Sequence, residues 1–164
     1  MNRILLMVLR NITKVPGLYS KLCRYAKNPD AYPEQERWDH ICHIMKLAVQ
    51  SGNLDLRLNG KENIPQENGF MMYANHQGMF DVVAIAGTCP TPLGIAYKKE
   101  LANVPVLKQI FQCTKSFAMD REDVRQSMTV IQNVAKELQK GGQVVAVLFV
   151  PEQVRLAFQF DVRL

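Results

Sequence analysis

The residues best suited to chemistry lie in the stretch Tyr73-Ala-Asn-His-Gln-Gly-Met-Phe-Asp81, where a histidine and an aspartate stand five residues apart. On a regular helix His76 and Asp81 would point away from each other, because five residues turn through about 500°. They converge if His76 lies in a turn, which Gly78 permits, and Asp81 lies in the first turn of a following helix. An aspartate on one imidazole nitrogen then leaves the other nitrogen free to take a proton from a hydroxyl.

A base of this kind suits acyl transfer to an alcohol, because that reaction needs no nucleophile from the enzyme. The same pair also fits a structural interpretation, in which Asp81 caps a helix and His76 occupies a turn. The two residues by themselves leave both interpretations open.

The elements that must position this pair alternate between strands and helices. Apolar and alternating runs predict strands at 54–60, 70–74, 93–98, 115–119 and 143–150. Apolar spacing predicts helices at about 34–51, 81–89, 100–111 and 122–140. The apolar residues of the last helix step by three and four: Val124, Met128, Ile131, Val134, Ala135 and Leu138. This interleaving predicts an α/β fold with a central mixed sheet flanked by helices. The tail at 156–164 alternates and is a candidate for one more strand.

The first 27 residues carry six basic residues and no acidic one. Apolar residues recur at helical spacing on both sides of Pro16-Gly17, which predicts two short amphipathic helices joined at that break. Such helices suit a membrane interface, with their apolar face in lipid and their cations near lipid phosphates. Packing on their own domain is the alternative. We therefore expect a membrane-contact segment at 1–33 and an α/β domain at 34–164.

Composition excludes several other classes of protein. The hydrophobic fraction of 48% in 164 residues is that of a folded domain. The net charge of +5 favours an anionic partner, but the aromatic share of 8% shows no basic-aromatic interleaving outside the first helices, so we expect no nucleic acid. The four cysteines form no CxxC pair, and His40, Cys42 and His43 match no strong metal motif, so we expect free thiols and no metal.

Four segments, in one order along the chain, resemble the blocks of a known family. NHQGMFD resembles the N-H-x-S-x-x-D block of the glycerolipid acyltransferases, the family of 1-acyl-sn-glycerol-3-phosphate acyltransferases. AYKKELANVP, KSFAMDRED and LFVPEQVR resemble the later blocks, the last of which reads F-P-E-G-T-R in the family. The resemblance covers about 54–155, and we expect a bacterial member of the family.

The resemblance implies that His76 is the general base that deprotonates the acceptor hydroxyl and that Asp81 orients it. The hydroxyl would attack the thioester of acyl-coenzyme A or acyl carrier protein, a co-substrate rather than a bound cofactor. The implied acceptor is lysophosphatidic acid or a related lysolipid, and the product is then phosphatidic acid. The amphipathic start matches the family's membrane habit, so we expect a peripheral, monotopic protein on the cytoplasmic face of the cell membrane.

Further site residues follow from the same resemblance. Arg121 would bind the acceptor's phosphate through its forked donors, and Lys98 is a second candidate for that phosphate. Glu152 and Arg155 fall on the acceptor-binding positions of the third block.

The chain also departs from the family pattern. Gly78 replaces the serine of the first block, and Gln153 and Val154 replace the glycine and threonine of the third. Family members usually continue well beyond this block, so we expect a domain that is incomplete at its carboxyl end. A catalytically inactive, truncated relative that keeps the fold and membrane binding is therefore the alternative interpretation.

Overall fold

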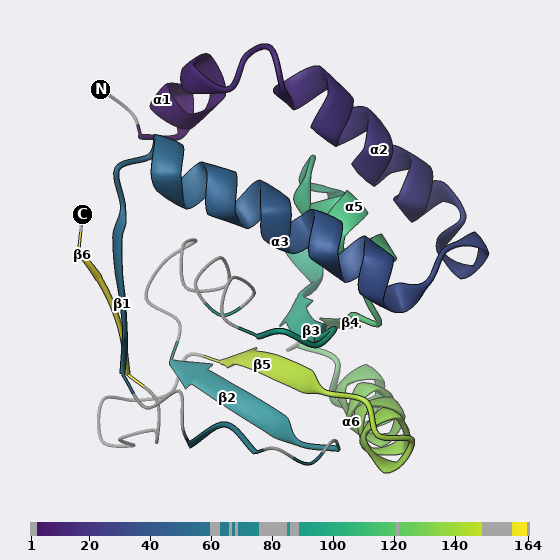
Figure 1. Ribbon diagram of the computed structural model, residues 1–164. Coiled ribbons are helices and arrows are strands. Elements are labelled where there is room, and N and C mark those ends of the chain that lie inside the picture. The colour runs from purple at the N-terminus through teal and green to yellow at the C-terminus, as the bar shows by residue number, and fades with distance from the viewer. Residues whose placement is uncertain are drawn as a thin grey trace.

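The computed structural model describes residues 3–59, 63–65, 67, 69–75, 85, 89–120, 122–148 and 159–163 (Figure 1). In chain order the elements are α1 (Arg3–Arg10), α2 (Val15–Lys27), η1 (Pro29–Ala31), α3 (Glu34–Ser51), β1 (Asp55–Asn59), β2 (Met71–Asn75), β3 (Gly94–Lys98), η3 (Lys99–Asn103), α5 (Leu107–Cys113), β4 (Phe117–Met119), α6 (Val124–Gln139), β5 (Val144–Leu148) and β6 (Gln159–Arg163).

The main sheet has four parallel strands in the order β2-β5-β3-β4. In the register, Val144 of β5 lies level with Met71 of β2 and with Gly94 of β3. Val144 and Val145 are both buried and point to opposite faces, as expected for a strand that is covered on both sides. The predicted α/β fold with a central sheet flanked by helices is confirmed.

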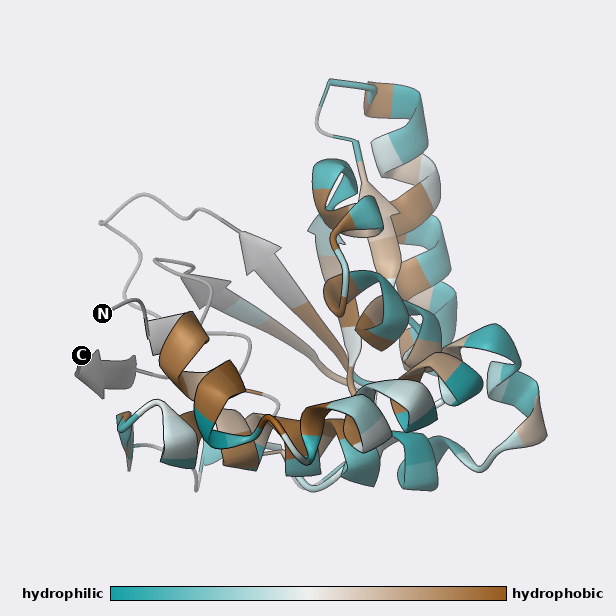
Figure 2. Cartoon of the chain, turned by 90° about the horizontal axis from the view of Figure 1, so that it is seen from above, coloured by the Kyte–Doolittle hydropathy of each residue, from teal (hydrophilic) through white to brown (hydrophobic). Residues whose placement is uncertain are grey.

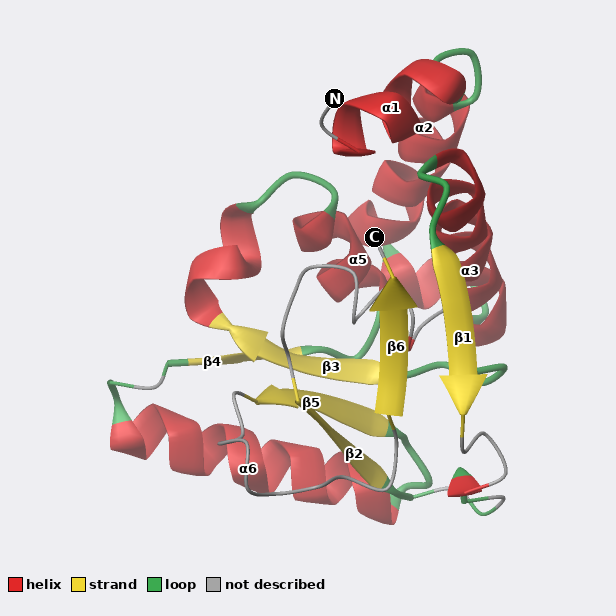
Figure 3. Ribbon diagram, turned by 90° about the vertical axis from the view of Figure 1, so that its left-hand side faces the viewer, coloured by secondary structure: helices red, strands yellow, loops and turns green. Residues whose placement is uncertain are grey.

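Helices cover both faces of this sheet, which gives a three-layer arrangement (Figure 3). Ile95 and Val145 face a cluster built with α2, α3 and α5. Ala96 and Val144 face α6, which contributes Val130 and Val134. The alternation of side chains along a strand therefore divides the core into two parts.

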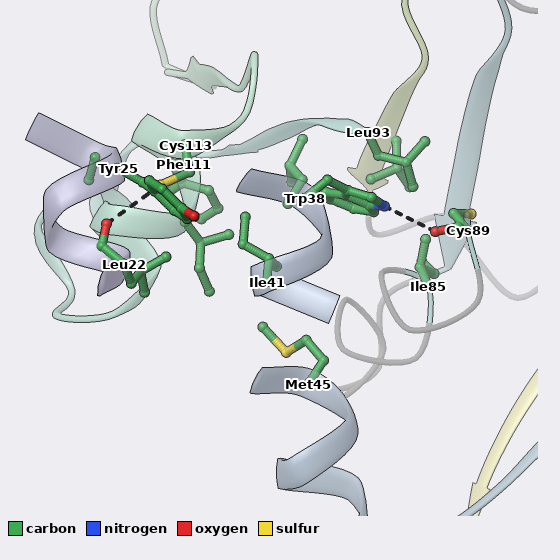
Figure 4. Close-up of a cluster of buried hydrophobic side chains, with 14 residues drawn as sticks. Leu22, Tyr25, Trp38, Ile41, Met45, Ile85, Cys89, Leu93, Phe111 and Cys113 are labelled. Atoms are coloured by element: carbon green, nitrogen blue, oxygen red, sulfur yellow. Dashed lines mark hydrogen bonds between the residues drawn. The ribbon is translucent and has the colours of Figure 1, made fainter. Parts of the chain in front are cut away.

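The larger part of the core is organised around α3 (Figure 4). Trp38 is 1% exposed, and its Nε1 donates to the carbonyl oxygen of Cys89 at 3.0 Å. Arg37, also buried, donates from Nη1 to the carbonyl oxygen of Cys113 at the end of α5. The helix predicted at 34–51 therefore contacts segments that are far from it in sequence, and it holds them together over the sheet.

A second, two-stranded sheet pairs β1 with β6 in antiparallel fashion, with Asp55 opposite Arg163 and Asn59 opposite Gln159. The predicted strand in the tail therefore exists, but it does not extend the main sheet. The prediction of one mixed sheet is therefore corrected for the described residues: the parallel strands form one sheet, and the antiparallel pair forms a second. Local alternation predicts a strand but does not choose its neighbour.

The amino-terminal segment differs from its prediction in two respects. The break between its helices lies at residues 11–14, because Pro16 and Gly17 fall inside α2. Proline is tolerated in the first turn of a helix, where its missing N–H has no intrahelical partner to lose. The apolar stripe of α2, with Leu22 and Tyr25, is buried in the domain core.

Helix α1 is largely hydrophobic, as its colouring shows (Figure 2), but several of its apolar residues lie outside the core. Leu5, Val8 and Leu9 are exposed, and so is Ile12 just beyond the helix. Arg10 fixes α1 to the end of α3, because its Nη1 donates to the carbonyl oxygen of Ser51 at 2.8 Å. Within the described residues, no helix is long and apolar enough to cross a bilayer.

Candidate active site

The four strands are parallel, so their carboxyl ends lie at the same edge of the sheet. Asn75 of β2 pairs with Leu148 of β5, and Lys98 of β3 pairs with Met119 of β4. β3 and β5 pair from Gly94 and Val144 to Ala96 and Ala146, and their pairing does not extend to Lys98 and Leu148.

Each block of the predicted site directly follows one of these strand ends. His76 comes after Asn75, Arg121 comes two residues after Met119, and the segment with Glu152 and Arg155 comes after Leu148. His76, Asp81, Arg121, Glu152 and Arg155 themselves lie outside the described residues. The carboxyl ends of parallel strands are the usual ligand-binding edge of an open α/β sheet.

Lys98 is the one predicted site residue that the structure describes. It ends β3, and its Nζ lies 3.0 Å from Oε1 of Glu100, with both side chains more than half exposed. The backbone N–H of Glu100 lowers the pKa of its own carboxyl, and the bond to Lys98 lowers it further. Exposed pairs of this kind contribute little to stability, so Lys98 can exchange Glu100 for a bound anion.

Lys99, next to it, is held more firmly. Its Nζ lies 2.9 Å from Oδ2 of Asp120, whose other oxygen, Oδ1, accepts from the backbone N–H of Glu122 at 3.1 Å. The hydrogen bond to Asp120 raises the pKa of Lys99, and the same bond lowers the pKa of Asp120. This pair connects the end of β3 to the end of β4.

Asp120 is also fixed through its backbone to the start of α6. Its N–H donates to Oε1 of Gln126 at 2.9 Å, and its carbonyl oxygen accepts from the hydroxyl of Ser127 at 2.7 Å. Gln126 in turn donates from Nε2 to the carbonyl oxygen of Ala118 at 2.8 Å. The chain is thus anchored immediately before Arg121 in the sequence.

Sequence reasoning missed this anchor. The signal was present, since Asp120 stands next to Arg121 and Lys99 next to Lys98. The bonds join residues 6 to 21 positions apart, however, and only the meeting of β4 with β3 and α6 brings them together.

A polar cavity of about 270 Å³ lies at the opposite edge of the sheet, near the amino ends of its strands. Gly94, at the start of β3, and Lys115, just before β4, are among its lining residues. Lys115 is already engaged there, with Nζ 2.7 Å from Glu137 and 3.3 Å from Glu34. The cavity is therefore separate from the edge where the predicted site residues follow the strands.

The histidine–cysteine group on α3 has structural partners. His40 is buried, and its Nε2 donates to the carbonyl oxygen of Leu18 at 3.0 Å. Burial raises the pKa of the Cys42 thiol to about 11. Among the described residues, no three histidine, cysteine, aspartate or glutamate side chains gather where they could hold a metal ion.

Comparison with known proteins gives the family. A family model described as Acyltransferase matches residues 55–152, more than half of the chain. The 1-acyl-sn-glycerol-3-phosphate acyltransferase of Saccharomyces cerevisiae is 26% identical over 113 residues, which cover 69% of this chain. The chain spans about a third of the length of that relative, with 35% of the yeast protein covered. No solved structure matches the chain.

Proposed function

This chain belongs to the acyltransferase family, and we propose that it moves a fatty acyl group from a thioester carrier to the free hydroxyl of lysophosphatidic acid. The carrier is coenzyme A or acyl carrier protein, and the product is phosphatidic acid. The name of the yeast relative supports this choice of acceptor.

The observation that carries the proposal is the carboxyl edge that the four parallel strands share. Each of the segments with His76, Arg121 and Glu152 begins within two residues of a described strand end. These segments are distant in sequence, and the parallel sheet brings the points at which they begin to the same edge. An acceptor with a hydroxyl at one end and a phosphate at the other could bind along this edge, across the segments that begin there.

In the proposed reaction His76 takes the proton of the acceptor hydroxyl, and Asp81 stabilises the protonated ring. The acceptor oxygen attacks the thioester carbonyl carbon and forms the new ester bond. The carbon–sulfur bond then breaks, and the thiolate of the carrier takes the proton from His76. Arg121, supported by the anchor at Asp120, and Lys98 bind the phosphate of the acceptor. Glu152 and Arg155 complete the acceptor site.

The lipid acceptor and product require contact with a membrane, and α1 is the segment best suited to provide it. Its apolar residues are exposed, and no acidic residue precedes Asp30. Lys14, Arg24 and Lys27 are exposed nearby in sequence, where they can meet anionic headgroups. We place the protein on the cytoplasmic face of the cell membrane, as a peripheral protein without nucleic acid partners.

The test is acyl transfer from labelled acyl-coenzyme A, and separately from acyl carrier protein, to lysophosphatidic acid in vesicles. His76→Ala should lower turnover by roughly 10²–10⁴-fold, the usual contribution of a general base. His43→Ala is the matched control, because His43 is an exposed histidine on α3, and it should leave turnover unchanged. Turnover that survives His76→Ala would contradict the assigned mechanism.

A second candidate function is a catalytically inactive relative that keeps the fold and membrane binding. It is favoured by Gln153 and Val154, which stand where the family has a glycine and a threonine. Gln and β-branched Val lack the backbone freedom that glycine supplies close to a ligand. If the protein is folded and binds vesicles but transfers an acyl group from neither carrier, the result supports this candidate over the first.

A further inference from the structure

Helix α6 carries an apolar stripe that the described residues of its domain leave exposed. Val124 is 73% exposed, and Met128 and Ile131 are each 52% exposed. Ala135, in line with them, is also exposed. We call these four residues the α6 seam.

The seam is separate from the face by which α6 packs on the sheet. That face is formed by Val130 and Val134, which are buried against β3 and β5. On the side of β4, Gln126 bonds to Ala118. At about 100° per residue, the seam lies roughly opposite Gln126 around the helix and about a quarter turn or more from the buried face. The part of the chain that the structure describes therefore leaves the seam open.

The spacing of the seam is that of a helix–helix contact. Its residues recur at intervals of four, three and four, which is the alternation of apolar positions in a coiled coil. With 16 residues, α6 is about 24 Å long, so the seam runs along most of its length. A second helix with matching spacing can pack into it.

The charges at the two ends of α6 identify this second helix. Glu122 precedes the helix and Lys136 lies in its last turn, both exposed and without an ion pair among the residues that the structure describes. In an antiparallel pair that sets Met128 against Ile131, Val124 lies opposite Ala135. Lys136 of one copy and Glu122 of the other then lie at nearly the same height along the paired helices, one residue apart. The two helix dipoles run in opposite directions, which is the favourable orientation.

We propose that α6 is the interface of a two-fold symmetric homodimer, formed by antiparallel packing of the α6 seam against the same seam of a second copy. The arrangement is self-complementary, so it closes at two copies. Stable interfaces bury at least about 1,200 Å², and a contact made by four residues of one helix from each copy buries less. We therefore expect a weak dimer, with a dissociation constant in the micromolar range.

The test is sedimentation velocity of the full chain over a concentration series up to about 100 μM, with charge-reversed variants. Lys136→Glu and Glu122→Lys should each raise the dissociation constant by about tenfold, because each places like charges together at both ends of the symmetric contact. The double variant should restore it to near the wild-type value, which a general loss of folding would not do.

Apolar variants provide the matched comparison. Met128→Glu should abolish the dimer, whereas Leu9→Glu, on the exposed face of α1, should leave it intact. The proposal is overturned if the wild-type chain stays monomeric throughout, if association is lost with Leu9→Glu but not with Met128→Glu, or if assembly continues beyond two copies. It is likewise overturned if the double charge variant fails to recover association.

Discussion

Helices α1 and α6 both leave an apolar stripe exposed, but their charges are arranged differently. Around α1 the sequence is basic only, with no acidic residue before Asp30. At α6 the charges are of both signs, with Glu122 and Asp123 just before the helix, Arg125 in its first turn and Lys136 in its last turn. An anionic lipid surface complements the first pattern, whereas an antiparallel copy of the same helix complements the second. Exposed apolar area alone therefore does not identify a partner, and the charge around it does.

The largest expected effect is on membrane binding by α1. Replacing Leu5 and Leu9 with glutamate removes two leucines from the proposed lipid contact, at about 1.5–3 kcal/mol each, and adds negative charge. We expect binding to phosphatidic acid vesicles to fall on the order of a hundredfold or more. Cosedimentation with vesicles measures it.

Met128→Glu is the control for this experiment, since it alters the other stripe. At protein concentrations below the dissociation constant of the proposed dimer, it should leave vesicle binding unchanged. Added salt should weaken the wild-type binding, because exposed charges are screened. Equal loss of vesicle binding in both variants would remove the distinction between the two helices.

A smaller effect is expected at the start of α6. Asp123 caps the helix, and its Oδ1 accepts from the backbone N–H groups of Arg125 at 2.9 Å and Gln126 at 3.0 Å. Asp123→Ala should lower the free energy of unfolding by about 1 kcal/mol, whereas Asp123→Ser, which keeps a capping oxygen, should cost much less. Urea denaturation measures both, and vesicle binding through α1 should not change. An alanine variant as stable as the wild type would show that this cap does not support α6.

The smallest effect concerns the packing of α2 against α3, where His40 bonds to the carbonyl of Leu18. Burial lowers the pKa of His40 below its ordinary value of 6.5, and Lys21 and His43 act in the same direction. The folded protein therefore binds the proton less readily than the unfolded chain. This contribution to stability is present above about pH 6.5 and is lost as the pH falls through the folded pKa.

His40→Gln should flatten this part of the dependence of stability on pH, because glutamine does not titrate and can still donate to the carbonyl of Leu18. Thermal unfolding between pH 5 and 8 measures it, with exposed His43→Gln as the control. An unchanged slope in His40→Gln would assign the dependence to other groups.

Local patterns predicted the elements well where one physical signal dominates. The helix expected at about 34–51 is α3, Glu34–Ser51, which follows Pro33. The strands expected at 70–74, 93–98, 115–119 and 143–150 correspond to β2, β3, β4 and β5. For the site, the blocks were found at strand ends, and of their candidate residues the structure describes Lys98.

The sequence was a poorer guide to which apolar face is buried. Of the apolar set predicted for α6, Val134 is buried against the sheet, whereas Val124, Met128 and Ile131 are exposed. Val130, which the prediction did not include, is buried in their place. Both stripes have helical spacing, and only the position of β3 and β5 selects between them. The same holds for α1 and α2, whose stripes look alike in sequence, although α2 is buried and α1 is exposed.

The sequence by itself determined the elements, the order of the family blocks and the basic character of the amino terminus, because these depend on residues close together in the chain. Only the tertiary structure decided that four parallel strands share one carboxyl edge, that β6 pairs with β1, and that Lys99 anchors Asp120. Those features depend on contacts between distant segments. The physical reason is that a strand or helix forms from its own pattern, but its neighbours are chosen by the packing of the whole chain.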